Sequence, residues 1–338
     1  MDQGPTVLVT GGTGLLGAHL LHRLTAQGQR VRATRRPGAD SGFVEWVFGL
    51  YSPNPQPLLN LVEWAEADLL DYTSLLHAAQ GIRTVYHTGA MVSFNPADAQ
   101  AVLTTNVLGT ANIVDACLAQ GVAELCHVSS VAALGSPNSE GLIDEQCAWG
   151  KSKGRSAYAR SKFLGENQAW RAMEMGLRVV VLNPSVILGP GRWTSGSGQL
   201  FSRVRRGMPF YTSGMSGYVD VRDVARAATE LMARAEINGE RFVLNSQNIS
   251  FGELFGLMAQ HLHRRAPWLR IPWALAAAAY PIVWLAGTLS GRGSSLSWAN
   301  LQSAFGQSRY SAAKIATQLN FSFIPISESI AFIAKQMD

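Results

Sequence analysis

Short apolar runs alternate with amphipathic stretches along the first part of this chain. The apolar runs are Thr6–Val9, Arg30–Ala33, Val62–Ala67, Thr84–Tyr86, Glu124–Val128 and Arg178–Leu182. Between them, apolar residues recur with helical spacing over Ala18–Gln27, Tyr72–Ala79, Asn106–Gln120 and Ala157–Met175. Strands that alternate with helices predict right-handed βαβ units, and therefore an α/β fold whose doubly wound parallel sheet carries helices on both faces.

The alternation weakens after Asn183-Pro184. A Gly/Ser-rich stretch over 189–198 predicts a flexible loop. The later segments have mostly helical patterns, at Leu200–Arg206, Arg222–Arg234, Ser250–His263, Trp298–Phe305 and Ile326–Met337. We therefore expect one domain over residues 1–190 and a smaller, mostly helical C-terminal substrate domain over 191–338. Part of 218–250 is expected to return to the large sheet, at Glu240–Leu244 and Tyr218–Val221.

Composition and charge exclude several classes of function. A chain of 338 residues with 47% hydrophobic and 15% charged residues can bury a large core. Its net charge of +5 is mild, and no block of Lys and Arg indicates a nucleic-acid partner. The three cysteines lack the spacing of a metal site. Because the pattern of a signal peptide is also absent, we expect a cytoplasmic protein that binds no metal and no nucleic acid.

One long run from Ile271 to Leu289 is uncharged and largely apolar. Its length approaches that of a membrane span, yet Pro272 and Pro281 interrupt it and four consecutive alanines make it only mildly hydrophobic. We favour a kinked helix packed in the smaller domain over a membrane span. Peripheral membrane contact through 271–289, which would help to reach an apolar substrate, is the alternative.

The first apolar run leads directly into a glycine-rich turn and then a helix. Residues 7–17 read VLVTGGTGLLG, with the spacing Gly-x-x-Gly-x-x-Gly. Glycine tolerates positive φ and lets a phosphate approach the backbone, and the helix N-terminus offers free N–H groups. The alternative is a glycine-rich turn without a ligand. We predict a Rossmann-type domain in which a dinucleotide pyrophosphate contacts Gly11, Thr13, Gly14, Leu15, Leu16 and Gly17.

Two further features follow the glycine turn in a fixed order. Ser129-Ser130 follows Val128 at the end of an apolar run, and Tyr158-x-x-x-Lys162 lies on a predicted helix. In this combination the chain resembles the short-chain dehydrogenases/reductases. Nearly the whole chain resembles their extended branch, which includes dihydroflavonol reductases, 3β-hydroxysteroid dehydrogenases and sugar-nucleotide epimerases and dehydratases. The resemblance implies the fold and a bound NAD(P), but it does not imply the substrate.

The resemblance also implies a catalytic group of Ser130, Tyr158 and Lys162. A lysine four residues after a tyrosine lies on the same helix face, and its charge should lower the tyrosine pKa from about 10. Tyr158 would then give a proton to a carbonyl oxygen as hydride arrives, and Ser130 would hydrogen-bond the same oxygen. Ser130 is preferred to Ser129 because Gly135 follows at the spacing of extended members. Lys162 would also hold the nicotinamide ribose.

The end of the second strand is expected to select the cofactor. An acidic residue there would hold the ribose hydroxyls of NAD, but the sequence has Arg35 and Arg36 at this point and no acid before Asp40. A planar guanidinium suits a phosphate, so we favour NADP(H), with NAD(H) as the alternative. Arg36 is the better candidate, because a similar run in plant dihydroflavonol reductases uses that position for the 2′-phosphate.

Other contacts are implied by the resemblance alone. Asp68 and Leu69 would contact the adenine, although Asp68 could be an ordinary cap between strand and helix. Asn106 would brace the backbone near the site or cap its helix, and His87 is interpreted as structural. The remaining cofactor candidates are Thr88, Gly89, Ala90, Val128, Tyr158, Lys162, Pro184, Ser185 and Val186. Candidates for the substrate wall, by position only, are Met91, Ser93, Ala132, Asn183, Trp193, Ser197 and Phe201, any of which could equally be core.

Two interpretations concern the assembly of the chain. Residues 218–225, YVDVRDVA, resemble a segment typical of extended members, and we interpret their charges as capping the next helix and tying the domains together. Relatives pair through two helices that flank the active site, here 106–120 and 157–175. We therefore expect a homodimer that acts on a small-molecule carbonyl substrate.

Three functions are compatible with these features. The first is an NADPH-dependent reductase of a ketone or aldehyde, favoured by Arg36 and by the apolar run at 271–289. The second is a nucleotide-sugar 4-epimerase or dehydratase with resident NAD, in which Arg192 or Arg203 could hold a phosphate. The third is a non-catalytic NADP-sensing protein, which would not need an intact Ser/Tyr/Lys group.

Overall fold

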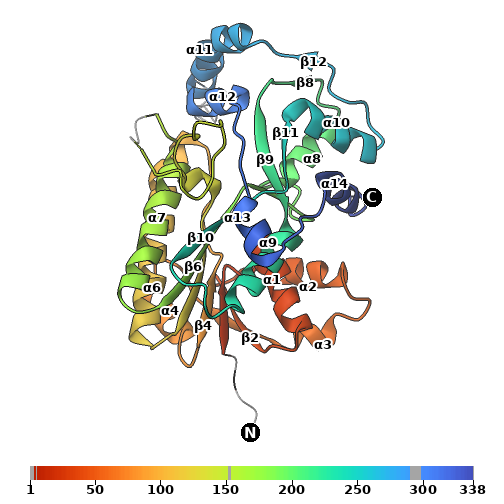
Figure 1. Cartoon of the computed structure of the whole chain (residues 1–338). Coiled ribbons are helices and arrows are strands. Elements are labelled where there is room, and N and C mark those ends of the chain that lie inside the picture. The colour runs from red at the N-terminus through yellow and green to blue at the C-terminus, as the bar shows by residue number, and fades with distance from the viewer. Residues whose placement is uncertain (1–3, 5, 151–153, 290–297, 338) are drawn as a thin grey trace.

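The computed structural model describes residues 4, 6–150, 154–289 and 298–337. Within these ranges, the largest sheet has seven parallel strands in the order β10-β6-β5-β4-β1-β2-β3 (Figure 1). They are β1 (Val7–Thr10), β2 (Val31–Arg35), β3 (Val62–Glu66), β4 (Thr84–His87), β5 (Glu124–Val128), β6 (Arg178–Pro184) and β10 (Glu240–Leu244). The strand order reverses between β1 and β4, which opens a crevice at the carboxyl edge of the sheet.

Side chains of the strands alternate between two layers of helices. In β1, Val7 and Val9 pack into one layer and Leu8 packs into the other. The first layer contains α1 (Leu15–Ala26), α2 (Gly42–Gly49) and α9 (Val221–Met232), and the second contains α4 (Tyr72–Ala78), α6 (Gly109–Ala119) and α7 (Ala157–Glu174) (Figure 1). Both faces are therefore buried, as a parallel sheet requires. The predicted doubly wound sheet is confirmed.

Short elements connect these layers. They are α3 (Gln56–Leu59), a 3₁₀ turn η1 (Pro96–Asp98), α5 (Ala99–Leu103), a π-helical turn η2 (Thr104–Leu108) and a 3₁₀ turn η3 (Val131–Ala133). The helix predicted at Asn106–Gln120 therefore begins inside the π-helical turn and continues as α6.

Beyond β6 the chain forms a smaller region next to the carboxyl edge of the sheet (Figure 1). Its helices are α8 (Gly198–Arg205), α10 (Phe251–His261), α11 (Trp273–Leu289), α12 (Trp298–Phe305) and α14 (Ile326–Ala334). Its strands are β7 (Val186–Leu188), β8 (Phe210–Tyr211), β9 (Met215–Asp220), β11 (Gln247–Ser250) and β12 (Leu269–Arg270). A further helix, α13 (Ala313–Leu319), returns to the large sheet, where Ile315 joins the core.

The expected return of 218–250 to the large sheet is correct for one strand and wrong for the other. Glu240–Leu244 forms β10 and pairs with β6. Tyr218–Val221 does not join this sheet, because Tyr218 lies in β9, which pairs with β7 and β11 in a separate three-stranded sheet. Pro184 ends β6 and lacks an N–H donor, so the chain leaves the large sheet there and β7 begins the second one.

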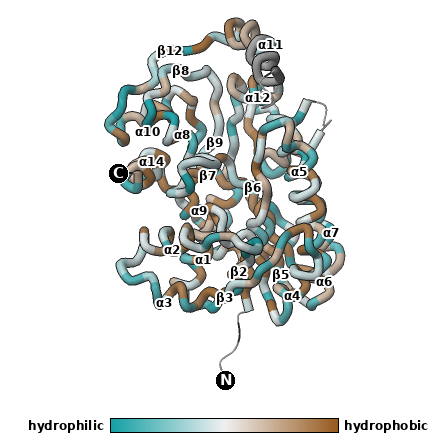
Figure 2. The backbone as a smooth tube through the Cα atoms, turned by 180° about the vertical axis from the view of Figure 1, so that it is seen from behind, coloured by the Kyte–Doolittle hydropathy of each residue, from teal (hydrophilic) through white to brown (hydrophobic). Residues whose placement is uncertain are grey.

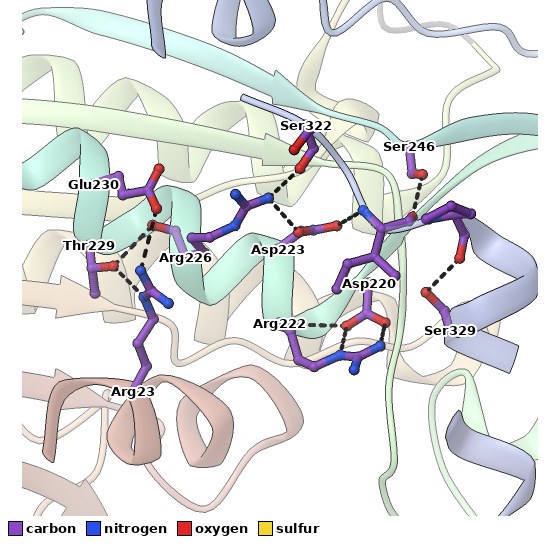
Figure 3. A network of polar contacts seen from close by, with 12 residues as sticks. Arg23, Asp220, Arg222, Asp223, Arg226, Thr229, Glu230, Ser246, Ser322 and Ser329 are labelled. Atoms are coloured by element: carbon purple, nitrogen blue, oxygen red, sulfur yellow. Dashed lines mark hydrogen bonds and ion pairs between the residues drawn. The ribbon is translucent and has the colours of Figure 1, made fainter. Parts of the chain in front are cut away.

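The charges of 218–225 tie the end of the chain to α9. Asp220 caps α9 by accepting a hydrogen bond from the Arg222 N–H at 2.8 Å, and both of its oxygens bind the Arg222 guanidinium. The buried Asp223 accepts hydrogen bonds from the Ile324 N–H at 2.7 Å and from Arg226 Nη2 at 2.8 Å (Figure 3). The structural interpretation of these charges is confirmed.

The apolar run after Ile271 forms α11, with Pro281 inside the helix. A helix is therefore correct, but close packing is wrong for its first turns, because Leu275 is 61% exposed. A different stretch, Pro96–Ala119, is long and apolar enough to cross a membrane by length and composition among the described residues. Of its apolar 18-residue window, 44% is buried within the protein, and core helices meet the same criterion.

Candidate active site

The predicted cofactor residues follow the carboxyl ends of successive strands. Gly11 follows β1, Arg36 follows β2, Asp68 follows β3, Thr88–Ala90 follows β4, Ser130 follows β5, and Pro184–Val186 lies at the end of β6. Because the strands are parallel, all of these ends lie at one edge of the sheet. The fold therefore brings the predicted residues to the crevice at which α/β sheets bind ligands.

Close backbone packing explains glycine at positions 11 and 17. Gly11 has a φ of +69°, and a Cβ there would lie 2.7 Å from the Gly89 Cα. A Cβ on Gly17 would lie 2.2 Å from the carbonyl oxygen of Gly11. The turn after β1 is therefore pressed against both the loop after β4 and the first turn of α1, and no larger residue fits at either position.

The N-terminus of α1 is open to an anion. Gly14 is its N-cap residue, without a side-chain cap and without an acid in the first turn. A cavity of about 140 Å³ lies beside it, with Gly14, Leu15, Phe43 and Arg192 in its lining. Free helix N–H groups, the positive end of the helix and a guanidinium together suit a diphosphate. These residues therefore fit a dinucleotide, and the sequence did not single out Phe43 or connect Arg192 with the cofactor.

Arg35 and Arg36 differ in their surroundings. Arg35 Nη2 lies 3.6 Å from a carboxylate oxygen of Glu66, and its guanidinium lies 5.8 Å from the centre of the Trp64 ring. The Arg36 side chain is exposed and forms no ion pair with any residue that the structure describes. Arg36 could therefore bind a phosphate without breaking an ion pair, whereas Arg35 is already paired with Glu66.

Asp68 and Leu69 have different roles in the loop after β3. An Asp68 oxygen accepts a hydrogen bond at 2.8 Å from the N–H group two residues further on. The cap of α4 is Asp71 instead, which accepts hydrogen bonds from N–H groups of the first turn. Leu69 packs against the loop after β4 and against the start of α6, since a Cβ on Gly89 would lie 3.2 Å from the Leu69 Cδ1 and a Cβ on Gly109 would lie 2.8 Å from the Leu69 Cβ. Leu69 thus supports the edge of the crevice.

Asn106 braces the backbone at Met91. Its Oδ1 accepts a hydrogen bond from the Met91 N–H at 2.7 Å, and its Nδ2 donates to the Met91 carbonyl and to Ser161 Oγ, both at 2.9 Å. The N-cap residue of α6 is Leu108. Asn106 is therefore a brace and not a cap, and it connects the loop after β4 to α7.

His87 is a structural histidine, as predicted. It is buried, with Nδ1 2.7 Å from Thr10 Oγ1 and Nε2 3.1 Å from Thr110 Oγ1. Burial lowers the pKa of His87 to about 3. The ring is therefore neutral near pH 7 and connects β1, β4 and α6 beneath the site.

Ser130, Tyr158 and Lys162 meet at the end of β5. Tyr158 lies in the first turn of α7 and hydrogen-bonds Ser130, and Lys162 Nζ donates a hydrogen bond to the Val128 carbonyl at 2.9 Å. Ser156 fixes the start of α7, since its hydroxyl accepts a hydrogen bond from the N–H of the third helical residue at 3.1 Å. The structure therefore brings the three predicted catalytic residues together.

Burial governs the protonation of this group. It raises the pKa of Tyr158, and the hydrogen bond with Ser130 acts in the opposite direction. Burial lowers the pKa of Lys162 to about 8, against the effect of the Glu166 carboxylate. The expected lowering of the tyrosine pKa by Lys162 is therefore not found, because the ammonium is directed at the Val128 carbonyl. Near neutral pH, Tyr158 holds its proton and Lys162 keeps most of its charge.

A buried polar network supports the catalytic group from behind. Glu166, one helical turn after Lys162, accepts hydrogen bonds from Asn183 Nδ2 at 2.8 Å and from Arg241 Nη1 at 3.2 Å. The same Asn183 nitrogen donates to the Ser130 carbonyl at 3.1 Å. A chain of hydrogen bonds therefore connects Arg241 of β10, through Glu166 and Asn183, to Ser130. The sequence did not indicate Glu166 or its partner Arg241, because a Glu four residues after a Lys is also typical of an exposed helix pair.

Two candidates for the substrate wall are placed elsewhere. Asn183 is fully buried behind Ser130, where its amide nitrogen is engaged. Phe201 is 1% exposed, inside the hydrophobic cluster of the smaller region. These two expectations are corrected, because neither side chain is free to contact a ligand.

The other candidates remain near the crevice. Met91 and Ser93 lie in the loop after β4, where Met91 contacts Asn106 and the Ser93 hydroxyl donates a hydrogen bond to Asp98. Ala132 follows β5, and its N–H donates a hydrogen bond to the Ser130 hydroxyl. Two more lie in the loop 189–198. There Ser197 lines the cavity beside α1, and Trp193 makes an edge contact with Trp46, with ring centres 6.4 Å apart.

Phe94 is an aromatic neighbour of the proton donor that the sequence did not indicate. Its ring lies edge-on to Tyr158 with centres 5.2 Å apart, and it is 54% exposed. Its carbonyl accepts a hydrogen bond from Asn300 of α12 at 2.8 Å. The loop after β4 thus contacts the smaller region at the mouth of the site. A single aromatic residue in a loop has no periodicity, so no pattern could have revealed it.

A larger cavity lies away from this group. It measures about 790 Å³ and its lining includes Glu145, Glu240, Arg241 and Lys314. None of the predicted catalytic or cofactor residues lines it. The carboxyl edge of the sheet, rather than cavity size, therefore locates the site.

Comparisons with known proteins agree with this geometry. The family described as "NAD dependent epimerase/dehydratase family" matches residues 7–244, which include the glycine turn and the catalytic group. Sterol demethylase protein B from Methylococcus capsulatus is 32% identical over 270 residues, which cover 79% of this chain and 77% of that protein. Cinnamoyl-CoA reductase 1 from Petunia hybrida is 29% identical over 271 residues, covering 76% of this chain and 78% of that protein.

A solved structure agrees in fold. A nucleoside-diphosphate-sugar epimerase from Pseudomonas aeruginosa superposes with a TM-score of 0.76 at 22% identity, covering 99% of this chain and 98% of that one. Identity at this level supports the shared fold alone. The family match and the relatives found by sequence show the family and the class of enzyme. This chain belongs to the NAD-dependent epimerase/dehydratase family, within the extended short-chain dehydrogenases/reductases, and is an NAD(P)-dependent oxidoreductase.

Proposed function

We propose that this protein is an NADP(H)-dependent reductase that converts an apolar ketone or aldehyde to the alcohol, or catalyses the reverse oxidation. The observation that carries the proposal is the end of β2. Arg36 lies there, exposed and without an ion pair among the described residues, where an acid would favour NAD. A guanidinium at this position suits the 2′-phosphate that distinguishes NADP from NAD.

NADPH supplies a hydride when it is bound. The residues of the chain position the substrate oxygen and supply the proton. Tyr158 Oη is protonated near neutral pH, because burial raises its pKa, and it donates this proton to the substrate oxygen. The Ser130 hydroxyl donates a hydrogen bond to the same oxygen and stabilises the charge that develops on it. Lys162, held by the Val128 carbonyl, places a positive charge beside the site and would hold the ribose hydroxyls.

Other residues would hold the rest of the cofactor. The N–H groups after Gly14 would bind the pyrophosphate, with Arg192 on the opposite wall of the small cavity. Leu69 and Gly89 would support the dinucleotide from below, because both lie at the β1–β4 crevice.

The loop after β4 supports an apolar substrate. Phe94 exposes its ring beside Tyr158, and Val92 in the same loop is also exposed. Residues 88–98 contain no Lys or Arg that could hold a diphosphate, and they contain the acid Asp98. Covering these apolar side chains would favour a hydrophobic substrate, since its binding removes apolar area from water. The name of the sterol demethylase relative is consistent with this polarity.

A nucleotide-sugar 4-epimerase or dehydratase with resident NAD is the second candidate. It is favoured by the description of the matching family, which names epimerases and dehydratases. Of the two arginines considered for a sugar-nucleotide phosphate, Arg192 lies in the cavity beside α1, and Arg203 is an exposed residue of α8. The place of Arg192 suits the phosphates of the cofactor, which weakens the argument for an epimerase.

The first experiment identifies the cofactor and its exchange. The purified protein is denatured, any released nucleotide is identified by mass, and the apo form is titrated with NADPH and NADH before a panel of apolar ketones and aldehydes is assayed. We expect little retained nucleotide, tighter and exchangeable binding of NADPH, and turnover of at least one apolar carbonyl. Tightly retained NAD would make the epimerase the better assignment. Selective NADPH binding without turnover across the panel would indicate the NADP-sensing role.

A further inference from the structure

Charge is divided unevenly along this chain. Residues 191–219 and 254–327 together contain ten Arg and Lys and no Asp or Glu, whereas the rest of the chain has 18 Arg and Lys against 23 Asp and Glu. These two segments form most of the smaller region, including α8, α11 and α12 (Figure 1). The smaller region also contains the acids Asp220, Glu253 and Glu328, next to the ends of these segments, and it still carries a net positive charge. Such an asymmetry favours an anionic partner for one face of the molecule.

The same region exposes a connected set of large apolar side chains. Leu269 of β12 pairs with Phe210 of β8, and Trp268, which is 62% exposed, precedes this pair. Figure 2 shows the connection that leads from β12 into α11, and the Trp273 ring lies 5.6 Å from that of Trp298 on α12. We call the set the apolar rim. Its exposed members are Phe210, Trp268, Leu269, Trp273, Leu275 and Trp298.

Three arginines flank the apolar rim. Arg264, Arg265 and Arg270 are all exposed, and none of them forms an ion pair with a described residue. The Arg265 guanidinium lies 5.8 Å from the centre of the Trp268 ring. Exposed tryptophan and leucine bordered by free cations is the arrangement of proteins that bind at a membrane surface. Aliphatic members such as Leu275 offer no face on which a nucleic-acid base could stack, so the rim favours lipid.

We propose that the apolar rim docks on the surface of a membrane that contains anionic lipid. The rim side chains would enter the boundary between headgroups and acyl chains, and the three arginines would face the lipid phosphates. The helix α11 has 17 residues with a proline inside it, which is short for a transmembrane span. The rim therefore attaches the protein to one face of the membrane.

The rim is continuous with the mouth of the active site. Trp298 begins α12, and Asn300 of the same helix donates a hydrogen bond to the Phe94 carbonyl at 2.8 Å. The Phe94 ring in turn lies 5.2 Å from that of Tyr158. Docking would therefore bring the proton donor close to the lipid. On the proposed reductase function, an apolar ketone could then reach Tyr158 without passing through bulk water.

Vesicle flotation tests the docking without any turnover, so its outcome is independent of the reductase proposal. The full-length protein is mixed with vesicles of phosphatidylcholine alone or of equimolar phosphatidylcholine and phosphatidylglycerol. We expect the protein to float with the anionic vesicles and to remain behind with the neutral ones. Binding should weaken as salt rises, because the charges are exposed and screened by ions.

Two sets of variants separate the contributions of charge and apolar area. The double variant Arg264→Gln/Arg265→Gln should bind anionic vesicles about 30-fold more weakly, at about 1 kcal/mol for each cation near an anionic surface. Leu275→Ser should weaken binding by about tenfold through lost apolar burial. The matched controls lie in the large-sheet region, where Arg83→Gln/Arg234→Gln removes two exposed arginines and Met175→Ser removes an exposed apolar side chain. Gel filtration and thermal unfolding would confirm that each variant folds.

Three outcomes would overturn the proposal. Equal binding to neutral and anionic vesicles would show that the arginines do not contribute to docking. Equal losses of vesicle binding in the control variants would show that the rim is not the docking site. Absence of vesicle binding together with a dimer that Leu275→Ser dissociates would show that the rim contacts a second copy of the chain. With a long-chain ketone, anionic vesicles should also raise the rate more for the parent protein than for Leu275→Ser. Failure of that last test alone, with vesicle binding intact, would count against the reductase proposal and not against docking.

Discussion

The large-sheet region and the smaller region differ in how their charged side chains are placed. Around the large sheet, buried acids are held by arginines, as Glu166 is by Arg241 and Asp223 is by Arg226. In the smaller region, the arginines that flank the apolar rim are exposed, and 254–327 contains no acid at all. A buried pair depends on both of its members, because the loss of one leaves an uncompensated charge. Exposed cations act together over a distance, and salt screens them.

Buried ion pairs suit the proposed proton transfer, whereas exposed charges suit the proposed docking on a membrane. Proton transfer needs a small number of groups at fixed positions, which the buried contacts behind Ser130 provide. Docking needs only charge and apolar area, which many residues share. Single substitutions in the catalytic group or in the buried contacts behind it should therefore change turnover or stability. Substitutions in the apolar rim should leave the turnover of a water-soluble substrate unchanged.

The largest effect is expected from Tyr158→Phe. The change removes only the hydroxyl that donates the proton, so turnover should fall by about 10²- to 10⁴-fold while the Kd for NADPH stays the same. Steady-state kinetics and a fluorescence titration of NADPH measure the two quantities. Leu275→Ser in the apolar rim is the matched comparison and should turn over a short, soluble ketone at the parent rate. If Tyr158→Phe kept its activity, Tyr158 would not be the acid.

Acid pH should destabilise the large-sheet region through its buried histidines. Burial lowers the pKa of His87 to about 3 and that of His127 well below its usual value, so both rings fold in the neutral form. The unfolded chain binds the extra protons, and the free energy of unfolding should fall as the pH drops below about 6.5. For His87 alone the loss is about 3 kcal/mol by about pH 4. Urea unfolding over this pH range measures it.

His127 offers a specific test of that explanation. Neither of its ring nitrogens has a hydrogen-bond partner among the described residues, so His127→Phe removes a titrating group without breaking a hydrogen bond. The variant should lose less stability on acidification than the parent protein does. The control is His77→Phe, at an exposed position of α4, which should follow the parent curve. Parallel curves for all three proteins would assign the acid sensitivity to other groups.

The large sheet could be predicted because its signals are local. The six strands predicted in the first part of the chain are short, and each of the first five is followed by a helix before the next strand begins, so pattern and fold agree along this part of the chain. The position of Tyr218 could not be predicted in this way. An apolar segment can pair with any strand edge that is available. Because β6 ends at Pro184 and β7 begins a second sheet, the strand that contains Tyr218 pairs with β7 and not with β6.

The site was predictable to the extent that its residues are defined by motifs. Gly11, Tyr158 and Lys162 lie at the carboxyl edge of the sheet as expected, because a motif fixes both the residue type and the element that carries it. Phe94 and Glu166 could not be found in the same way. Their roles depend on contacts between segments far apart in sequence, such as the hydrogen bond between Glu166 and Arg241.

Arg36→Ala should have a moderate and selective effect. A charge-assisted hydrogen bond contributes about 1.5–3 kcal/mol, so the Kd for NADPH should rise by about 10- to 100-fold while that for NADH changes little. Arg35→Ala is the matched control, because Arg35 pairs with Glu66 and should discriminate less between the two cofactors. Titrations of both variants with both cofactors give the four values. Equal weakening of NADPH and NADH by Arg36→Ala would remove Arg36 from the phosphate site.

The smallest expected effect on turnover is a shift in pH dependence caused by Glu166→Gln. The pKa of Lys162 is lowered to about 8 by burial, and the Glu166 carboxylate acts in the opposite direction. Glutamine can keep the hydrogen bond from Asn183 but not the charge, so Lys162 should lose its proton at a lower pH. The basic limb of the profile of kcat against pH should therefore move to lower pH, while the rate on the acidic side of the profile stays close to that of the parent protein.

Glu174→Gln is the matched control for this change, since Glu174 is an exposed residue of the same helix. A purely structural role for Glu166 would lower the rate equally at every pH or reduce the amount of folded protein. It would not move the limb. A limb that stays in place in a folded Glu166→Gln variant would mean that the buried carboxylate positions Asn183 without controlling Lys162. The geometry of the hydrogen bonds would then matter more to this site than local charge does. The large-sheet region would differ from the apolar rim in its dependence on that geometry.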